Sequence, residues 1–161
     1  MKIRNACMAD LEAVAQMEML CFPEAEAATI ESFRERISIF GDFFWLLENE
    51  SGRLVGMING MVTDETTLRD EMFEDATMHN PNGAWQMIFG GETIPECREK
   101  GYAALIMNRV IEDCRMQGRK GIVLTCKDKL VPYYSKFGFV NEGKSASVHG
   151  GAVWYDMRLT F

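Results

Sequence analysis

The segment IPECREKGYAA, at residues 94–104, is the most informative part of this chain. It follows an apolar, strand-like segment and leads into a long segment whose apolar residues have helical spacing. The first turn of a helix has backbone N–H groups without partners, and the helix dipole adds partial positive charge there. Small residues at Gly101, Ala103 and Ala104 let a bound anion approach the backbone closely. The junction therefore predicts a pyrophosphate site at a helix N-terminus.

Length and charge limit the classes of protein that fit. The 161 residues are 47% hydrophobic and 25% charged, so we expect one domain, residues 1–161, with a full core. The net charge of −7 argues against a nucleic acid partner, because phosphate binding needs a basic surface. No apolar run is long enough to cross a bilayer, and no signal peptide follows Met1. We expect a cytoplasmic protein with no membrane partner.

Cysteine and histidine usage argues against a structural metal. The five cysteines are widely spaced and include no Cys-x-x-Cys pair, which favours free thiols over a disulfide framework or a zinc site. Cys97 and Cys126 are expected to be packing or surface residues. His79 and His149 are the only histidines, so a site with several histidine ligands is excluded and no metal is expected.

Hydrophobic periodicity predicts an α/β fold with the element order βααββ(α)βαβαββ. We expect a mixed central sheet with helices on both faces. The predicted strands are 2–5, 43–47, 54–62, 84–93, 122–126, 139–141 and 152–157; the predicted helices begin at residue 9, after Thr29, after Arg98 and at Leu130, with a further optional helix in the acidic segment 65–78.

Three features in this order resemble the GNAT superfamily of N-acetyltransferases. The first is the Pro-Glu-x-Arg-x-x-Gly-x-Ala pattern at 95–103, and the second is the strand at 122–126. The third is VPYYSKFGF at 131–139, which is similar to the family's Tyr-x-x-x-Gly-Phe signature. The resemblance implies the GNAT acyl-CoA N-acyltransferase fold, acetyl-CoA as cofactor and an amine as acceptor.

Two further runs are similar to the arylalkylamine (serotonin) N-acetyltransferase branch. They are CKDKLVPYY at 126–134 and GRLV at 52–55, which is followed by an acidic stretch. The resemblance to this branch covers the chain from about Ile3 to Leu159.

The resemblance implies a role for three groups of residues. The cofactor pyrophosphate would bind beside Arg98 on the backbone N–H groups of Glu99, Lys100, Gly101, Tyr102, Ala103 and Ala104. The strand end formed by Gly91, Glu92 and Thr93 would lie along the pantetheine and hold the acetyl carbonyl through a backbone N–H. Tyr134 would contact the cofactor and act as the general acid that protonates the departing thiolate, with Tyr133 as the alternative.

The residues predicted to bind the acceptor amine differ from those of the arylalkylamine N-acetyltransferase branch. Animal enzymes of this branch use two histidines on the long strand as the base, and the matching positions here are Met87 and Phe89. Together with Gly91 these residues alternate onto one strand face, which predicts an apolar acceptor wall, and Thr125 lies where the family lines the acceptor pocket. Phe43 and Trp45 are further candidates for this wall. The candidate bases are Glu24, Glu26, Glu92 and His79, or a chain of water molecules with no dedicated side chain.

The implied activity is direct transfer of the acetyl group from acetyl-CoA to a primary amine, without a covalent cysteine intermediate. The resemblance and the apolar wall imply an arylalkylamine-like or other small alkylamine as the acceptor. The acidic clusters at 24–31 and 64–75 suit either a solvated surface or a rim that attracts a positively charged amine. Two alternatives stay open: a protein or peptide N-acetyltransferase, and a CoA-binding module without catalysis. Both a monomer and a homodimer are compatible with the sequence.

Overall fold

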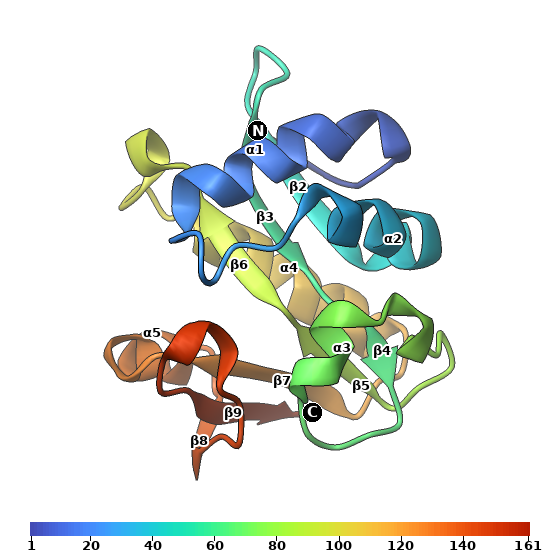
Figure 1. The fold of residues 1–161 in the computed structure, drawn as a ribbon, viewed down its shortest axis with the longest axis vertical. Coiled ribbons are helices and arrows are strands. Elements are labelled where there is room, and N and C mark those ends of the chain that lie inside the picture. The colour runs from blue at the N-terminus through green and yellow to red at the C-terminus, as the bar shows by residue number, and fades with distance from the viewer.

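A computed structural model describes all residues, 1–161, and contains nine strands and five α-helices joined by loops and short 3₁₀ turns (Figure 1). In chain order they are β1 (Lys2–Asn5), α1 (Leu11–Cys21), α2 (Ile30–Phe40), β2 (Phe44–Glu48), β3 (Leu54–Asn59), β4 (Val62–Thr63), α3 (Asp70–Glu74), β5 (Trp85–Ile88), β6 (Gly90–Thr93), α4 (Tyr102–Met116), β7 (Gly121–Cys126), α5 (Val131–Ser135), β8 (Val140–Lys144) and β9 (Tyr155–Thr160).

The strands form two sheets that meet in the middle of the molecule. The first sheet has the order β1-β2-β3-β6, and the second has the order β4-β5-β7-β9-β8. All strand pairs are antiparallel except β5 with β7. Helices α1 and α2 cover one face of the first sheet, and α4 packs on the opposite face against β2, β3 and β6 (Figure 1). The expected α/β fold, with helices on both faces, is therefore confirmed.

The prediction of one central sheet with a long strand at 84–93 is wrong in one respect. The strand divides at Phe89 into β5, which pairs with β7, and β6, which pairs with β3. The β5–β7 ladder ends at the pair Ile88–Leu124, so the chain leaves β7 at this point. The predicted strand 54–62 divides in the same way into β3 and β4. These two breaks open a gap between β6 and β7.

Local sequence signals account for the helices. The Thr29 side chain accepts a hydrogen bond from the Ser32 N–H at 3.2 Å and caps α2, as expected. The buried face of α2 includes Phe33, Ile37 and Phe40. The acidic segment 65–78 is only partly helical, since α3 spans five residues there.

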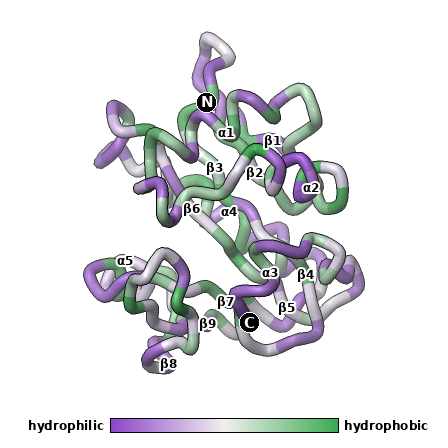
Figure 2. Tube along the Cα trace, in the orientation of Figure 1, coloured by the Kyte–Doolittle hydropathy of each residue, from purple (hydrophilic) through white to green (hydrophobic).

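The apolar core has two parts. A cluster of 24 buried residues lies between the helices and the two sheets, and a cluster of seven buried residues, which includes Phe40, Met72 and Met87, lies beside α3. Figure 2 shows hydrophobic residues along the central strands and hydrophilic ones at the loops. None of the helices has the length and apolar character that a bilayer crossing requires.

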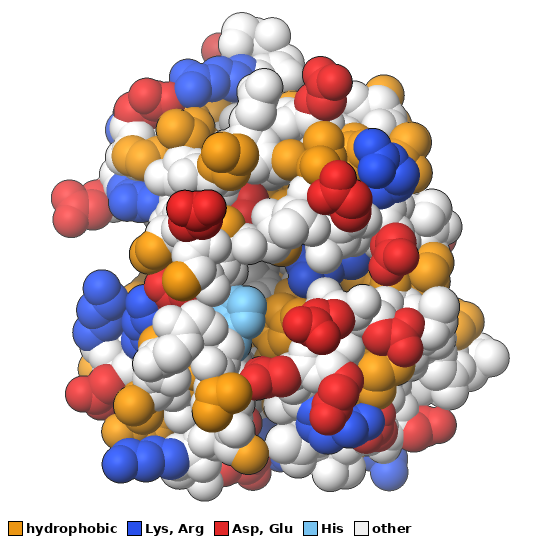
Figure 3. Space-filling model, in the orientation of Figure 1, with side chains coloured by type: hydrophobic (Ala, Val, Ile, Leu, Met, Phe, Trp, Pro, Cys, Tyr) orange, Lys and Arg blue, Asp and Glu red, His pale blue; other side chains and the backbone are white.

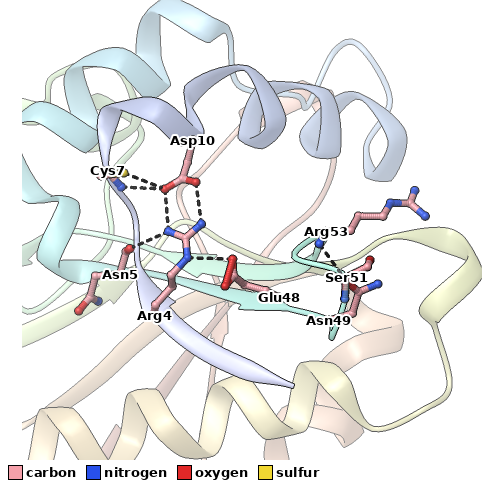
Figure 4. A network of polar contacts seen from close by, with 8 residues as sticks. All are labelled: Arg4, Asn5, Cys7, Asp10, Glu48, Asn49, Ser51 and Arg53. Atoms are coloured by element: carbon pink, nitrogen blue, oxygen red, sulfur yellow. Dashed lines mark hydrogen bonds and ion pairs between the residues drawn. The ribbon is translucent and has the colours of Figure 1, made fainter.

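An ion-pair network fixes the first strand to the start of α1 and to β2 (Figure 4). The Arg4 guanidinium donates two hydrogen bonds of 2.8 Å to the Asp10 carboxylate and one of 3.1 Å to Glu48. Asp10 also accepts the Cys7 N–H at 2.9 Å. The Arg4 guanidinium holds the pKa of Asp10 at about 2, below its usual range. The network therefore stabilises the folded state when Asp10 is ionised.

We expect Asp10→Asn to lower the free energy of unfolding at pH 7 by about 1–2 kcal/mol, because hydrogen bonds to the charged carboxylate are lost. The folded-state pKa lies below the unfolded value of about 3.9, so this stabilisation is complete above that value and is lost as the pH falls toward 2. Urea unfolding at several pH values measures the difference. Glu50→Gln, at an exposed turn position, is the control and should show no such pH dependence.

Candidate active site

The gap between β6 and β7 leads into a cavity of about 880 Å³. Its walls come from the loop between α1 and α2, the strand ends on both sides of the gap, and the segment between β8 and β9. The space-filling view shows a hollow in this face of the molecule, with charged, hydrophobic and histidine side chains along it (Figure 3). The expected acceptor residues Phe89, Gly91 and Thr125 all line this cavity.

A second cavity of about 330 Å³ lies beside the start of α4. Most of the predicted cofactor residues line it, namely Gly91, Glu92, Thr93, Arg98, Glu99, Gly101, Tyr102, Ala103, Ala104 and Tyr134. Lys100 is exposed and is not part of the wall. Gly91, Arg98 and Tyr134 line both cavities, so the two spaces adjoin at these residues.

The backbone before α4 is shaped to receive an anion. The N–H groups of residues 99–104 have no acceptor among the hydrogen bonds of the chain; the next N–H, that of Leu105, bonds to the Gly101 carbonyl at 3.0 Å. Glu99 and Gly101 have positive φ angles of 64° and 80°. Alternation of left-handed residues with ordinary ones turns successive N–H groups toward one concave side, an arrangement that binds anions. Glu99 is the only residue other than glycine with such a φ, which marks a locally strained segment.

The strand β6 also offers backbone donors to the gap. The Ile94 N–H bonds to the Val55 carbonyl on the β3 side at 3.0 Å. Because N–H directions alternate along an antiparallel ladder, those of Gly91 and Thr93 point away from β3, where β6 has no neighbouring strand. The Thr93 hydroxyl is buried and has no hydrogen-bond partner. This strand end therefore has unused donors at the junction of the two cavities.

Tyr134 extends from α5 to that junction. A Cβ built on Gly91 would lie 3.8 Å from the Tyr134 hydroxyl oxygen, which shows how closely the phenol approaches the strand. The hydroxyl makes no hydrogen bond within the chain and is not among the fully buried polar atoms. Burial of the ring raises the pKa of Tyr134, so the phenol keeps its proton at neutral pH.

Tyr133 occupies a different environment. It lines only the smaller cavity, and its hydroxyl is buried without a partner. Its ring packs edge-on against Tyr134 and Phe137. The geometry therefore favours Tyr134 over Tyr133 as a proton donor to a group at the junction.

Three of the residues expected at the acceptor wall lie elsewhere. Met87 is fully buried in the cluster beside α3, because the chain turns away from β7 only after Ile88. Trp45 is buried, and its indole N–H donates to Asp113 of α4 at 2.9 Å. Phe43 packs near Trp45 and lines neither cavity. These three side chains have packing roles.

Buried ionisable groups line both cavities: Glu18 and Arg36 line the larger one, and Glu92 lines the smaller one. Glu92 points to the Gly90 side of β6, away from Gly91, and both of its carboxyl oxygens lack hydrogen-bond partners. Burial and the nearby Glu18 raise the pKa of Glu92 well above the usual range of a glutamate carboxyl. Arg36 is buried beside these acids and donates to Asn59 at 3.2 Å and to the Phe73 carbonyl at 3.1 Å. Glu92 does not line the larger cavity, so its carboxyl group is not placed to take a proton from an acceptor bound there.

The other candidate bases are also placed unfavourably. Glu24 is exposed and outside both cavities. Glu26 lines the larger cavity, but its carboxylate forms an ion pair of 2.8 Å with Lys127. His79 accepts the Val62 N–H on Nδ1 at 3.0 Å and packs between Phe40 and Phe43, outside both cavities.

His149 is the titratable residue that the sequence did not single out. It lies between β8 and β9, and it lines the larger cavity. Its ring stacks on Phe73 with centroids 5.2 Å apart, and its Nε2 lies 2.9 Å from the Glu26 carbonyl oxygen. The sequence gives no motif around His149, so only the packing of three distant segments reveals its position.

Taken together, the open strand pair, the backbone donors before α4 and the tyrosine at the junction define an acyl-CoA-type N-acyltransferase fold. Residues 93–161 match the family model of the acetyltransferase (GNAT) domain. The family-model match and the fold described above together show that the chain carries a GNAT acetyltransferase domain.

Among curated proteins, the chain is similar to serotonin N-acetyltransferase of Mesocricetus auratus, with 30% identity over 112 residues, which are 69% of this chain and 53% of that protein. The chain thus spans about half the length of this relative.

Solved structures share the fold at low identity. The loading GNATL domain of CurA from Lyngbya majuscula matches with a TM-score of 0.85 and 14% identity, over 99% of this chain and 96% of that one. The GphF GNAT-like decarboxylase, in complex with isobutyryl-CoA, matches with a TM-score of 0.82 and 18% identity over 99% of both chains. At this identity the likeness concerns the fold, and the choice of reaction has to come from the site itself.

Proposed function

We propose that this protein is an acetyl-CoA-dependent N-acetyltransferase that acts on a small primary amine by direct attack. One observation carries the proposal: the anion-binding cavity at α4 and the larger cavity adjoin at Gly91 and Tyr134. A thioester that enters from the α4 side would therefore meet an amine from the other side next to a phenol that holds its proton.

The cofactor fits the residues that are present. The free N–H groups of residues 99–104 and the concave backbone around Gly101 suit a pyrophosphate, and the smaller cavity continues from there to the end of β6. When bound, acetyl-CoA supplies the activated acetyl group. The N–H groups of Gly91 and Thr93 would polarise its carbonyl, and Tyr134 would deliver a proton to the leaving sulfur.

The acceptor cavity favours a small amine over a peptide. The loop between α1 and α2 contacts the segment between β8 and β9 through the hydrogen bond of the Glu26 carbonyl with His149, and it contacts the end of β7 through the ion pair of Glu26 with Lys127. These contacts bridge the cavity and leave less room for an extended chain. Phe73 and Phe89, whose ring centroids lie 4.7 Å apart, give the cavity an aromatic wall for the body of the acceptor. The cytoplasmic location stays a prediction from the sequence.

The test is an acceptor screen with acetyl-CoA that follows the released thiol. Small arylalkylamines, polyamines and short peptides are compared at equal concentrations, and binding of CoA is measured separately by calorimetry. We expect CoA binding and thiol release that depends on a small amine. Release only with peptides would support a protein acetyltransferase, and binding without release by any amine would support a CoA-binding module; both results would contradict the proposal.

Gly101 offers a direct test of the anion site. We expect Gly101→Ala to weaken CoA binding about tenfold, because a side chain at φ 80° costs about 1–2 kcal/mol and turns the adjacent N–H groups from the ligand. Gly118→Ala is a matched control, since Gly118 has φ 77°, an equally open environment and no contact with either cavity. Equal CoA affinity in the two variants, measured by calorimetry, would exclude this site.

A further inference from the structure

We propose that His149 is the general base that accepts the proton of the acceptor ammonium in the larger cavity. The inference rests on the proposed function, and it names a residue for the step that Met87 and Phe89 leave without a proton acceptor. It is carried by the hydrogen bonding of the imidazole, by the contacts that fix the ring, and by its position on the cavity wall.

The hydrogen bonding of the ring determines which nitrogen is free. Nε2 lies 2.9 Å from the Glu26 carbonyl oxygen, and a carbonyl can only accept, so Nε2 carries the hydrogen of the neutral ring. Nδ1 is then the basic nitrogen. It has no hydrogen-bond partner in the chain and is not among the fully buried polar atoms. His149 lines the larger cavity, and a neutral imidazole that is held by a backbone carbonyl with its second nitrogen unpaired and not fully buried is arranged to take up a proton.

The segment that carries His149 is held from several directions. The Asp70 carboxylate of α3 accepts hydrogen bonds from the Ser147 hydroxyl and from the Val148 N–H. The imidazole stacks on Phe73 at an interplanar angle of 13°. The Trp154 indole N–H donates to the His149 carbonyl at 2.8 Å. The ring is therefore fixed against the cavity rather than free in solvent.

The charges that face this segment come from three elements. Glu26, in the loop between α1 and α2, is paired with Lys127, whose ammonium also lies 5.7 Å from the Trp154 ring. Asp70 and Glu74 of α3 also line the cavity. Glu18, Arg36, Arg98 and Lys129 line other parts of the cavity wall. Asp70 and Glu74 form no ion pair, so they favour a cationic acceptor on the side of the cavity where His149 lies.

The proton balance of the step is complete. The ammonium gives one proton to Nδ1 of His149, and the resulting amine forms the new C–N bond to the acetyl carbon. The C–S bond breaks, and the thiolate takes the proton of Tyr134. The second proton lost by nitrogen restores the phenol, directly or through water, and the His149 imidazolium then releases its proton to solvent. The net products are the amide, the free thiol and one proton.

The first experiment compares the pH dependence of acetyl transfer by the unmodified protein with the NMR titration of His149. The chain has two histidines, so a ¹H NMR titration gives two imidazole signals, and His149→Gln identifies the one from His149. We expect kcat/KM for the acceptor to rise with pH through a limb whose midpoint equals that of His149 in the free protein. A limb that does not match the His149 signal would overturn the proposal.

The second experiment compares variants. His149→Gln keeps an N–H that can reach the Glu26 carbonyl but has no basic nitrogen. We expect kcat/KM for the amine to fall at least about 100-fold and the acidic limb to disappear, while CoA affinity and the melting temperature stay unchanged. Glu24→Gln is the control, because Glu24 is exposed in the same loop region and lines neither cavity. A His149→Gln variant with the parental rate and pH profile would assign His149 a purely structural role.

The two proposals fail in different ways. If no amine releases thiol with the unmodified protein, the proposed function is wrong. If amine-dependent release occurs but is indifferent to His149 in both experiments, only this inference is wrong.

Discussion

Tyr134→Phe is expected to lower kcat for amine acetylation by about 100-fold or more, because it removes a general acid and leaves the ring in place. The hydroxyl makes no hydrogen bond within the chain, so its loss should leave the melting temperature unchanged. CoA should bind with parental affinity, since the backbone donors before α4 are intact. Steady-state kinetics with the best acceptor, together with calorimetry for CoA, measures both effects.

Tyr133→Phe is the matched control for this prediction. It removes the same atom from the neighbouring ring, whose hydroxyl is buried without a partner, and Tyr133 lines only the smaller cavity. We expect unchanged turnover and an unchanged or slightly higher stability, because an unsatisfied buried hydroxyl is removed. If Tyr133→Phe abolished turnover and Tyr134→Phe did not, the assignment of the acid would have to be exchanged.

The largest effect on stability is expected for Gly60→Ala. Gly60 lies between β3 and β4, where the backbone passes the strand that divides at Phe89. A Cβ there would be 1.7 Å from the Met87 carbonyl oxygen and 2.6 Å from the carbonyl carbon, and neither is a flexible side-chain atom. The backbones of the two broken strands would have to separate. We expect a loss of at least about 3 kcal/mol, as for severe overpacking, and a disturbed gap between β6 and β7.

Gly52→Ala is the comparison for Gly60. Gly52 lies in the turn between β2 and β3 with φ 85° and no atom within 4 Å of a built Cβ. Gly52→Ala should lower the free energy of unfolding by only about 1–2 kcal/mol, the strain of placing a side chain at a left-handed φ. Chemical denaturation measures the free energy of unfolding of both variants. Their CoA affinity shows whether the gap between β6 and β7 is disturbed. Similar stability losses in the two would show that the close approach at Gly60 is relieved elsewhere.

Local signals were sufficient to predict most of the secondary structure. The cap at Thr29, the apolar face of α2 and the helix after Arg98 depend on residues within a few positions of one another. The segment 98–104, which the sequence predicts to bind the pyrophosphate, was also predictable from local signals. Unpaired N–H groups at a helix start are a property of the local backbone. For that reason, all but one of the predicted residues at 98–104 line a single cavity.

The division of the strand at Phe89 could not be predicted in the same way. Residues 84–93 are uniformly compatible with a strand, and the choice of partner for each half depends on β3 and β7, which are distant in the sequence. The alternation argument that put Met87 and Phe89 on one wall assumed an unbroken strand. Once the strand changes sheets, Met87 belongs to the core and Phe89 to the cavity.

The sequence by itself therefore determined the order of elements apart from the two divided strands, the unpaired backbone N–H groups at the start of α4, and the tyrosine pair in α5. Only the tertiary structure decided which tyrosine reaches the junction, that Glu92 is buried against Glu18, and that His149 meets Glu26. The physical reason is the sequence separation over which each interaction acts. Capping, periodicity and backbone donors act over a few residues, whereas ionisation, burial and hydrogen-bond partners depend on segments brought together by packing; His149 and Glu26 are 123 positions apart.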